Sequence, residues 1–287
     1  MYQIVKKEIL NPTVTSMYIK APLVAAKAQA GQFIILRVDE NGERIPLTIA
    51  GYDRQNGVVR IIFQIVGATT KLLNSKNEGE YISDFVGPLG NPTETEGLKK
   101  VCVVGGGVGC AIALPVVQAL KENDCQVTSI IGFRSKDLVI LQDEFEQISD
   151  KCVLVTDDGS AGQKGNVCAP LNQMLQNGEN FDKVITIGPL VMMKFVTEAV
   201  RPTGIPCVVS MNPIMIDGTG MCGGCRLTLN QDGTRVVKFA CVDGPDFDGY
   251  LVDFDEAAMR NGMYSDFEHH AYESTCNLLN KEVENNA

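Results

Sequence analysis

The sequence predicts a fold in three parts: an N-terminal antiparallel β-barrel, a doubly wound parallel α/β domain and a C-terminal cysteine-rich module. Short segments with β-branched alternation fill roughly the first hundred residues, between Gly, Asp and Asn boundaries. Strand patterns then alternate with helix patterns, which is typical of a parallel sheet covered on both faces. Three cysteines gather between residues 222 and 241. We place the three parts at residues 1–98, 99–210 and 211–287.

The composition argues against two classes of protein. A chain of 287 residues, with 45% hydrophobic and 21% charged residues, is long enough for two ordinary domains. Its net charge of −10 argues against nucleic-acid binding, which needs basic patches. The longest apolar run, residues 101–120, is broken by glycines and a proline. It therefore predicts a strand, a turn and a helix rather than a membrane span.

The cysteines and histidines indicate where the chemistry lies. The first residues lack the apolar stretch of a signal peptide, so we expect a cytoplasmic protein. In a reducing compartment, ten cysteines are more typical of metal binding, redox chemistry or core packing than of disulfides. Both histidines, His269 and His270, fall in the tail, so we expect no catalytic histidine. We expect core positions for Cys102, Cys125, Cys152 and Cys207, and assign no chemistry to Cys110 and Cys168.

In the N-terminal part, strands are expected over residues 31–39, 44–53 and 57–66. A short helix is expected in residues 68–76, capped by Thr69 or Thr70. A turn and polar linker follow, at residues 87–97. In the α/β part we expect alternating strands and helices, at residues 99–106, 110–123, 126–135, 138–148, 151–160 and 182–200.

A glycine turn, residues 105–109, joins the first strand and helix of the α/β part. Glycines at such a turn let the backbone approach a phosphate and let helix N–H groups point at it. The spacing only approaches G-x-G-x-x-G, because Cys110 takes the third glycine slot. The second strand also ends without an acidic residue for a ribose. The turn thus favours a nucleotide, with a plain structural turn as the alternative.

The N-terminal part carries two further anion-binding patterns. Arg44 lies four residues before Thr48 in "RIPLT". A fixed guanidinium can pair with a pyrophosphate, and a hydroxyl on the same strand can meet a flavin ring. Gly67 and the hydroxyls of Thr69 and Thr70 precede a helix, which forms a second such arrangement. Taken alone, Arg44 would be an exposed strand arginine.

In this order, the motifs of roughly residues 1–210 resemble the ferredoxin-NADP reductase superfamily, in which a β-barrel binds FAD and an α/β domain binds a nicotinamide dinucleotide. Two positions depart from that pattern: Leu47 replaces a stacking aromatic residue, and Ile187 replaces a cysteine before Gly-Pro. The choice of NAD over NADP also rests on the resemblance. Arg134, after the second strand of the α/β part, can meet a 2′-phosphate, which favours NADP instead. The resemblance implies cofactor contacts by Arg44, Pro46, Leu47, Thr48, Gln64, Val66, Gly67, Thr69, Thr70, Gly87, Gly105, Gly106, Gly107, Val108, Gly109, Arg134, Asp157, Gly188, Pro189 and Met192.

The cysteine spacing is Asp217-x4-Cys222-x2-Cys225-x15-Cys241. With cysteine in the first position, this would be the C-x4-C-x2-C…C ligand pattern of a [2Fe–2S] cluster. The interleaved glycines allow the loop to wrap a cluster. Three alternatives stay open: a zinc site with three cysteines and one aspartate, unligated thiols, or a cluster with Asp217 as a bystander.

With this module included, the whole chain resembles the electron-transfer subunit of dihydroorotate dehydrogenase B, which uses four cysteines. The aspartate variant with an acidic tail is more similar to the small subunits of NADH-dependent reduced ferredoxin:NADP⁺ oxidoreductases, which are flavin-based electron-bifurcating heterodimers. That resemblance implies FAD, NAD(H) and a [2Fe–2S] cluster here. It implies a large partner subunit with a second FAD, [4Fe–4S] clusters and the NADP(H) site, which connects to ferredoxin. The alternatives are a dihydroorotate dehydrogenase electron-transfer subunit and a non-enzymatic redox sensor.

Overall fold

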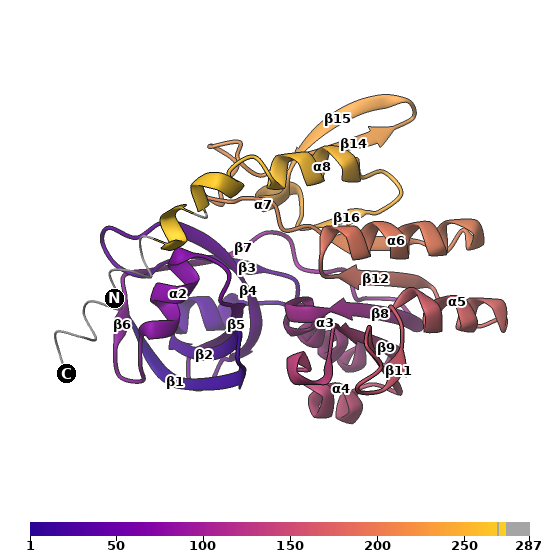
Figure 1. Ribbon diagram of the computed structural model, residues 1–287, viewed down its shortest axis with the longest axis horizontal. Helices are drawn as coiled ribbons and strands as arrows, with labels where there is room; N and C mark the ends of the chain where they lie inside the picture. The colour runs from indigo at the N-terminus through magenta and orange to yellow at the C-terminus, as the bar shows by residue number, and fades with distance from the viewer. Residues whose placement is uncertain (269, 274–287) are drawn as a thin grey trace.

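The computed structural model describes residues 1–268 and 270–273. Its N-terminal part is an antiparallel seven-stranded sheet in the order β6-β1-β2-β5-β4-β3-β7, curled into a half-barrel (Figure 1). The strands that form it are β1 (Tyr2–Asn11), β2 (Val14–Lys20), β3 (Phe33–Arg37), β4 (Arg44–Asp53), β5 (Val58–Gln64), β6 (Tyr81–Ile82) and β7 (Asp84–Leu89). Two short helices accompany them, α1 (Pro22–Lys27) and α2 (Ala68–Ser75). The predicted strands at residues 31–39, 44–53 and 57–66 correspond to β3, β4 and β5.

Helix α2 is present, and of the two predicted capping residues Thr70 contributes to the cap, from inside the helix rather than as the N-cap residue. The N-cap residue is Gly67, in an extended conformation, and Thr70 lies three positions inside the helix. The Thr70 hydroxyl accepts hydrogen bonds from the backbone N–H groups of Val66 and Gly67, each at 3.0 Å. A hydroxyl at this third position can reach back to the N-cap amide, and Gly67 has no side chain with which to cap the helix itself.

The second sheet has the order β11-β10-β9-β8-β12-β13-β16. Neighbouring strands are parallel except at the β13–β16 edge, where the pairing is antiparallel. The strands are β8 (Lys100–Gly106), β9 (Gln126–Phe133), β10 (Lys151–Thr156), β11 (Gln163–Lys164), β12 (Lys183–Ile187), β13 (Cys207–Ser210) and β16 (Asp246–Asp248). Central strands read as continuous apolar runs because both faces of the sheet are covered.

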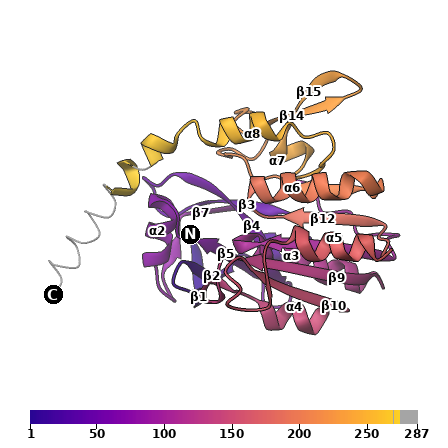
Figure 2. The same ribbon diagram turned by 45° about the vertical axis from the view of Figure 1, so that its right-hand side comes forward.

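Helices cover both faces of this sheet, so the predicted doubly wound arrangement is present (Figure 2). On one face, the core joins α3 and α4 to the sheet and to the half-barrel. On the other face, a separate core joins α5 and α6 to the sheet. The helices are α3 (Cys110–Glu122), α4 (Gln142–Ile148), α5 (Cys168–Gln176) and α6 (Leu190–Val200), with 3-10 turns η1 (Gly107–Gly109), η2 (Lys136–Leu138) and η3 (Arg201–Thr203).

The C-terminal part contains a two-stranded hairpin that the sequence analysis did not predict. It consists of β14 (Arg226–Gln231) and β15 (Thr234–Phe239), followed by α7 (Ala240–Asp243) and α8 (Phe254–Asn261). A third core joins this part to both others, through Phe33 and Ile35 of the half-barrel and Met193 of α6. Since β16 also pairs with β13, the C-terminal part is fixed to the α/β sheet, and the three-part residue division remains a prediction.

The buried cysteines follow the expectation, with one exception. Cys102, Cys125 and Cys207 are buried, whereas Cys152 is half-buried. His269 and residues 274–287, the end of the tail, lie outside the described residues. Within the described ranges, we find no helix that is both long and apolar enough to cross a membrane.

Candidate functional site

The glycine turn lies where the α/β sheet changes direction. Strand β8 has β9 on one side and β12 on the other, so successive crossovers leave it in opposite directions. Ligands of open α/β sheets bind in the crevice at the carboxyl ends of the strands at such a switch point. Here β8 ends in η1, directly before α3. The predicted dinucleotide turn therefore occupies the position that the topology favours.

Close packing brings this turn against the second predicted segment, at the end of β12. A Cβ atom on Gly109 would lie 2.4 Å from the carbonyl oxygen of Ile187 and 2.7 Å from Cα of Gly188. A Cβ on Gly106 would lie 2.3 Å from Sδ of Met192. At Gly109 the neighbour is backbone, so no side chain fits there, whereas at Gly106 the Met192 side chain would have to move.

Arg134 and Asp157 lie at the same edge of the sheet. They follow β9 and β10, and the Asp157 N–H donates to the carbonyl of Phe133 at 3.0 Å. Both side chains are exposed. The carboxyl ends of β8, β9, β10 and β12 thus gather most of the predicted dinucleotide residues along one edge.

The flavin-type residues meet at a second place, where β4 begins beside α2. Glu43, next to Arg44, accepts a hydrogen bond from the Thr69 hydroxyl at 3.2 Å, which holds the two segments together. Arg44 is exposed, and a Cβ added to Gly67 would meet nothing within 4 Å. An exposed guanidinium beside an open glycine and a helix start fits a phosphate-bearing cofactor.

Other predicted contacts in the half-barrel have different surroundings. Pro46, Leu47 and Thr48 are half-buried along β4, and Gln64 and Val66 are exposed where β5 ends. These side chains are exposed enough to contact a ligand, and their role in cofactor binding stays a prediction.

Gly87 differs from them because packing between two strands accounts for a glycine at this position. A Cβ on Gly87 would lie 2.6 Å from Cγ2 of Ile34, on the neighbouring strand β3. The close approach of β7 to β3 therefore accounts for this glycine without a cofactor.

Two of the three cysteines of the C-terminal module are in contact. The Cys225 thiol donates to Cys241 Sγ at 3.2 Å, and both residues are buried. Burial, together with the neighbouring Cys225 thiol, raises the pKa of Cys241 to about 12. Cys222 is exposed, and its sulfur accepts a hydrogen bond from the Gly224 N–H at 3.5 Å. Metal binding would have to displace the protons of these thiols, since thiolates are the ligands.

Asp217 is held by its own loop. Its carboxylate accepts hydrogen bonds from the Thr219 hydroxyl at 2.8 Å, from the Thr219 N–H at 3.1 Å and from the Met221 N–H at 3.2 Å. These bonds, the Thr219 hydroxyl first, lower the pKa of Asp217. The carboxylate is thus kept ionised, in the form that ligates metals.

The donor set fits an iron–sulfur cluster in its chemistry. Thiols with one carboxylate on a glycine-rich loop suit iron better than a hard cation. Gly218, Gly220 and Gly223 have φ of +81°, +83° and +66°, a backbone region that other residues rarely adopt. Within the described residues, however, no three His, Cys, Asp or Glu side chains stand close enough together to hold a metal ion. The assignment of Asp217 as the fourth ligand therefore stays a prediction.

The cysteine loop packs directly on the half-barrel. A Cβ on Gly218 would lie 2.7 Å from Cδ1 of Leu89 and 3.0 Å from Cγ1 of Ile35. Ile35 belongs to β3, in which Phe33 pairs with Thr48 of β4. The loop and the predicted flavin strand are thus separated by one strand.

The predicted linker after β7 also binds the C-terminal part, through hydrogen bonds that the sequence did not predict. The Asn91 N–H donates to the carbonyl of Gly244 at 2.7 Å, and the Thr93 hydroxyl donates to Asp246 at 2.6 Å. The partners are about 150 residues apart in the chain. No local pattern signals such pairs.

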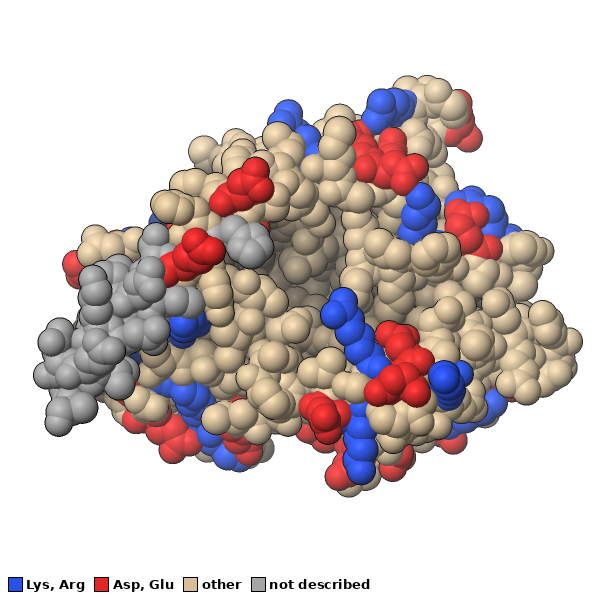
Figure 3. Space-filling model, viewed as in Figure 1, with Lys and Arg blue, Asp and Glu red and all other residues tan. Residues whose placement is uncertain are grey.

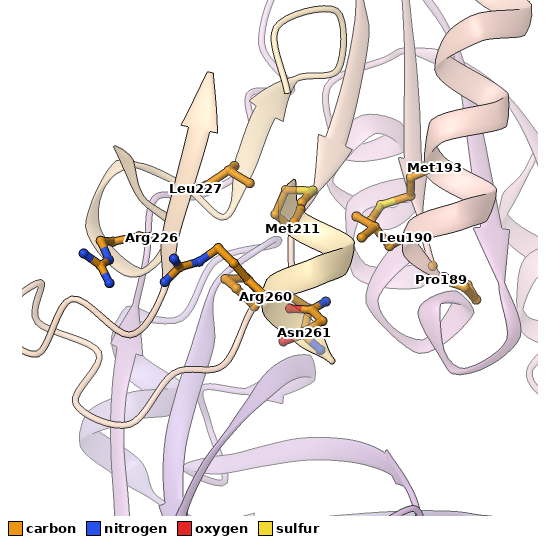
Figure 4. A pocket seen from close by; sticks show the side chains of 12 residues that line it. Pro189, Leu190, Met193, Met211, Arg226, Leu227, Arg260 and Asn261 are labelled. Carbon is orange, nitrogen blue, oxygen red and sulfur yellow. The ribbon is translucent and has the colours of Figure 1, made fainter. Parts of the chain in front are cut away.

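The surface is hollowed between the half-barrel, the α/β part and the C-terminal part (Figure 3). A pocket of about 210 Å³ lies between α6, β14 and α8 (Figure 4). It is lined by Gly188 and Pro189, which the sequence analysis singled out, and by Arg226 and Arg260, which it did not. Only the fold brings these two arginines together, because they lie far apart in the sequence.

Comparisons with known proteins define the class. The chain superposes on the Amycolatopsis cytochrome P450 reductase GcoB with a TM-score of 0.60, at 18% identity, covering 71% of this chain and 66% of that one. This likeness shows the ferredoxin-reductase-like fold. Residues 212–253 match the family model described as the iron-sulfur cluster binding domain of dihydroorotate dehydrogenase B. The chain therefore combines this fold with a segment that matches an iron–sulfur cluster binding domain.

Two closer matches define the family. A Thermotoga maritima protein named as a homolog of the electron transfer subunit of dihydroorotate dehydrogenase B (NAD(+)) is 47% identical over 271 residues, which is 94% of each chain. The solved structure of an NADH-dependent reduced ferredoxin-NADP oxidoreductase, described for flavin-based electron bifurcation, matches with a TM-score of 0.89 at 46% identity, covering 96% of this chain and 97% of that one. The chain belongs to the family of dihydroorotate dehydrogenase B electron-transfer subunits and their homologues. Its fold and matched domain support FAD, NAD(H) and a [2Fe–2S] cluster as its cofactors.

Proposed function

We propose that this chain is the small subunit of an electron-bifurcating NADH-dependent ferredoxin:NADP⁺ oxidoreductase. In this role it exchanges electrons with NAD(H) and passes them to or from a large partner subunit. That partner carries a second FAD, [4Fe–4S] clusters and the NADP(H) site, and it connects the complex to ferredoxin. The similarity to the solved bifurcating enzyme, which extends over 96% of the chain, supports this reading.

The observation that carries the proposal is the contact between the cysteine loop and the half-barrel. Gly218 packs on Ile35 and Leu89, one strand away from Thr48. An electron-transfer subunit needs its redox groups close together in a rigid frame. The third core supplies that frame, because it contains side chains from all three parts of the chain.

Each cofactor has a set of residues in this proposal. Arg44 and the start of α2 hold the FAD pyrophosphate, and Thr48 approaches the flavin ring. The glycine turn and the segment from Gly188 to Met192 hold NAD(H). Asp217 and the three cysteines of the C-terminal module hold the cluster. When bound, the flavin supplies the exchange between two-electron and one-electron transfer, and the cluster carries single electrons.

The chain's own contribution is position and exclusion of water. Cys225 and Cys241 are buried in the third core, while Cys222 faces the surface. The ligand set therefore bridges the interior, on the flavin side, and the exterior, where a partner docks. Met221, beside Cys222, is 88% exposed, which suits a protein contact there.

Four apolar residues of the C-terminal part divide between the chain's own cores and the surface. Phe254 is buried and Tyr250 and Leu251 are half-buried, and all three contact the chain's own cores. Met259 is 68% exposed and remains free for a partner.

The electron-transfer subunit of a dihydroorotate dehydrogenase is the second candidate, and the family membership supports it. Asp217 separates the two readings, since the resembling dihydroorotate dehydrogenase subunits use a cysteine there. A non-enzymatic redox sensor is a third reading, and it predicts no reduction of the flavin by NADH.

Stopped-flow absorbance of the isolated, FAD- and cluster-loaded chain tests the proposal. NADH should bleach the flavin, and the chain should reduce artificial dyes. Coupling of NADH and NADPH to ferredoxin should require the large subunit. Failure of NADH to bleach the flavin would refute the entry point. Full coupling by the isolated chain would refute the division of labour, and dihydroorotate-dependent reduction with a dihydroorotate-oxidising partner would favour the second candidate.

A further inference from the structure

The arginines of this chain divide by whether they have a partner. Arg37, Arg60, Arg201 and Arg235 form ion pairs with carboxylates. Arg54 donates to a backbone carbonyl and stacks on Tyr52. Within the part of the chain that the structure describes, the remaining arginine side chains have no hydrogen-bond acceptor or counter-ion. They are Arg44, Arg134, Arg226 and Arg260.

Two of these four lie at sites already assigned to a cofactor. Arg44 is assigned to the FAD pyrophosphate, and Arg134 lies at the dinucleotide edge of the sheet. A chain with 35 acidic and 25 basic side chains has carboxylates to spare for its arginines. A single exposed arginine without a counter-ion is ordinary, but Arg226 and Arg260 line one pocket together and have no assigned ligand.

Arg226 and Arg260 line one pocket although they come from different elements. Arg226 begins β14 and is exposed, and Arg260 lies in the last turn of α8 and is half-buried. Figure 4 shows both guanidinium groups on the same side of the pocket, opposite Leu190 and Met193. Two like charges on one pocket repel each other, and no Asp or Glu lines it.

The rest of the lining completes a site for a small organic anion. Asn212 and Asn261 add amide groups, while Met193, Met211 and Leu227 form an apolar floor. A volume of about 210 Å³ holds a phosphate and part of the group attached to it. Guanidinium groups bind phosphate through paired N–H donors, more strongly than a neutral hydrogen bond does.

We propose that this pocket binds the phosphate group of a small organic phosphate, with Arg226 and Arg260 as its charged donors. Two sources share this chemistry. One is the dinucleotide itself, because Gly188 and Pro189 belong both to the pocket and to the proposed NAD(H) segment. The other is a separate phosphorylated metabolite that binds beside the dinucleotide. Only the first source rests on the proposed function.

Calorimetric titration of the loaded chain with inorganic phosphate, at constant ionic strength, tests the site. The double variant Arg226→Gln/Arg260→Gln should bind phosphate at least tenfold more weakly than the natural chain. The matched control is Arg235→Gln, on the same hairpin, which loses one charge outside the pocket. It should bind phosphate as the natural chain does. Equal phosphate affinity in the double variant and the natural chain, or an equal loss in Arg235→Gln, would overturn the proposal.

A second titration, with NADH, distinguishes the sources. If the phosphate belongs to the dinucleotide, phosphate should compete with NADH, and the double variant should weaken NADH binding at least tenfold. If the ligand is separate, phosphate should bind equally well at saturating NADH, and the double variant should keep its NADH affinity. The phosphate titration needs no flavin reduction, so it stands even if NADH fails to reduce the flavin.

Discussion

The glycine turn after β8 and the cysteine loop before β14 are both rich in glycine, but their glycines do different work. In the turn, a Cβ atom on Gly109 would clash with the backbone of Ile187, and one on Gly106 would displace the Met192 side chain. In the loop, Gly220 and Gly223 adopt positive φ while a Cβ atom would meet only ordinary or slightly tight contacts. At these four positions packing constrains the turn and backbone conformation constrains the loop, whereas Gly218 in the loop combines a positive φ with close contact to Leu89.

This difference extends to the chemistry of the two regions. The close contacts of Gly106 and Gly109 are all with other parts of this chain, at the end of β12 and the start of α6. The loop brings Cys225 and Cys241 into contact, while Asp217 and Cys222 keep hydrogen bonds to their own backbone. An added methyl group at Gly109 should therefore disturb the turn, whereas the loop should depend on each of its thiol and carboxylate groups.

Loss of one thiol should therefore have the largest effect. We expect Cys225→Ser to abolish [2Fe–2S] binding, because a hydroxyl replaces a buried ligand. Iron and acid-labile sulfide analysis with EPR measures the loss. Cys168→Ser is the matched control, since this half-buried thiol lies far along the chain from the loop and should leave the cluster in place. Flavin reduction by NADH should survive in both variants. Full cluster content in Cys225→Ser would remove this cysteine from the ligand set.

The next largest effect is expected at the predicted FAD site. Arg44→Ala removes a charge-assisted phosphate contact worth about 1.5–3 kcal/mol, which is roughly a tenfold to hundredfold loss of FAD affinity. Equilibrium titration of the FAD-free chain measures it. Lys27→Ala, an exposed charge on α1 of the same half-barrel, is the control and should bind FAD normally. Unchanged FAD affinity in Arg44→Ala would discard the assignment of Arg44.

Within the turn, two glycines allow a test of packing against conformation. Gly109→Ala places a methyl group against the backbone of Ile187 and should cost about 1–3 kcal/mol of stability. Gly107 has φ of +54° and open space around it, and Asn tolerates that conformation. Gly107→Asn should therefore lower the thermal midpoint less than Gly109→Ala. The reverse order would show that conformation, not packing, shapes this turn.

The same contrast explains what the sequence could predict. Period-two alternation and buried apolar runs predicted β3, β4, β5 and the doubly wound sheet, because these patterns follow from which faces are buried. Thr70 was predicted as a capping residue of α2, but the N-cap position was not, since Gly67 carries no capping side chain and the Thr70 hydroxyl accepts from the Gly67 N–H. The hairpin β14–β15 was missed because neither strand alternates regularly between buried and exposed residues.

Contacts between distant segments were beyond the sequence for a different reason. Gly218 against Leu89, and Thr93 with Asp246, join residues that share no periodicity or spacing. The pairing of Arg226 with Arg260 in one pocket is of the same kind. Motif spacing predicts which residues carry chemistry, whereas the fold decides which of them meet.

The smallest expected effect concerns Asp217, the residue that distinguishes this loop from a four-cysteine one. An oxygen ligand donates less charge to iron than a thiolate does, so it leaves the oxidised cluster less stabilised. Asp217→Cys should therefore keep a [2Fe–2S] cluster and lower its potential, by an amount on the order of 100 mV given the wide range that ligand identity spans. Redox titration followed by EPR measures the shift.

Asp217 also accepts hydrogen bonds from Thr219 and Met221, so replacing it can alter the loop without any change in a metal ligand. A second variant is needed to separate these two effects. Asp217→Asn keeps an amide oxygen that can accept these hydrogen bonds, but it removes the charged ligand. If Asp217 ligates iron, Asp217→Asn should lose or destabilise the cluster, while Asp217→Cys retains it with an altered spectrum. If Asp217 only shapes the loop, Asp217→Asn should keep the natural potential and spectrum. An unchanged potential in both variants would thus make Asp217 a bystander.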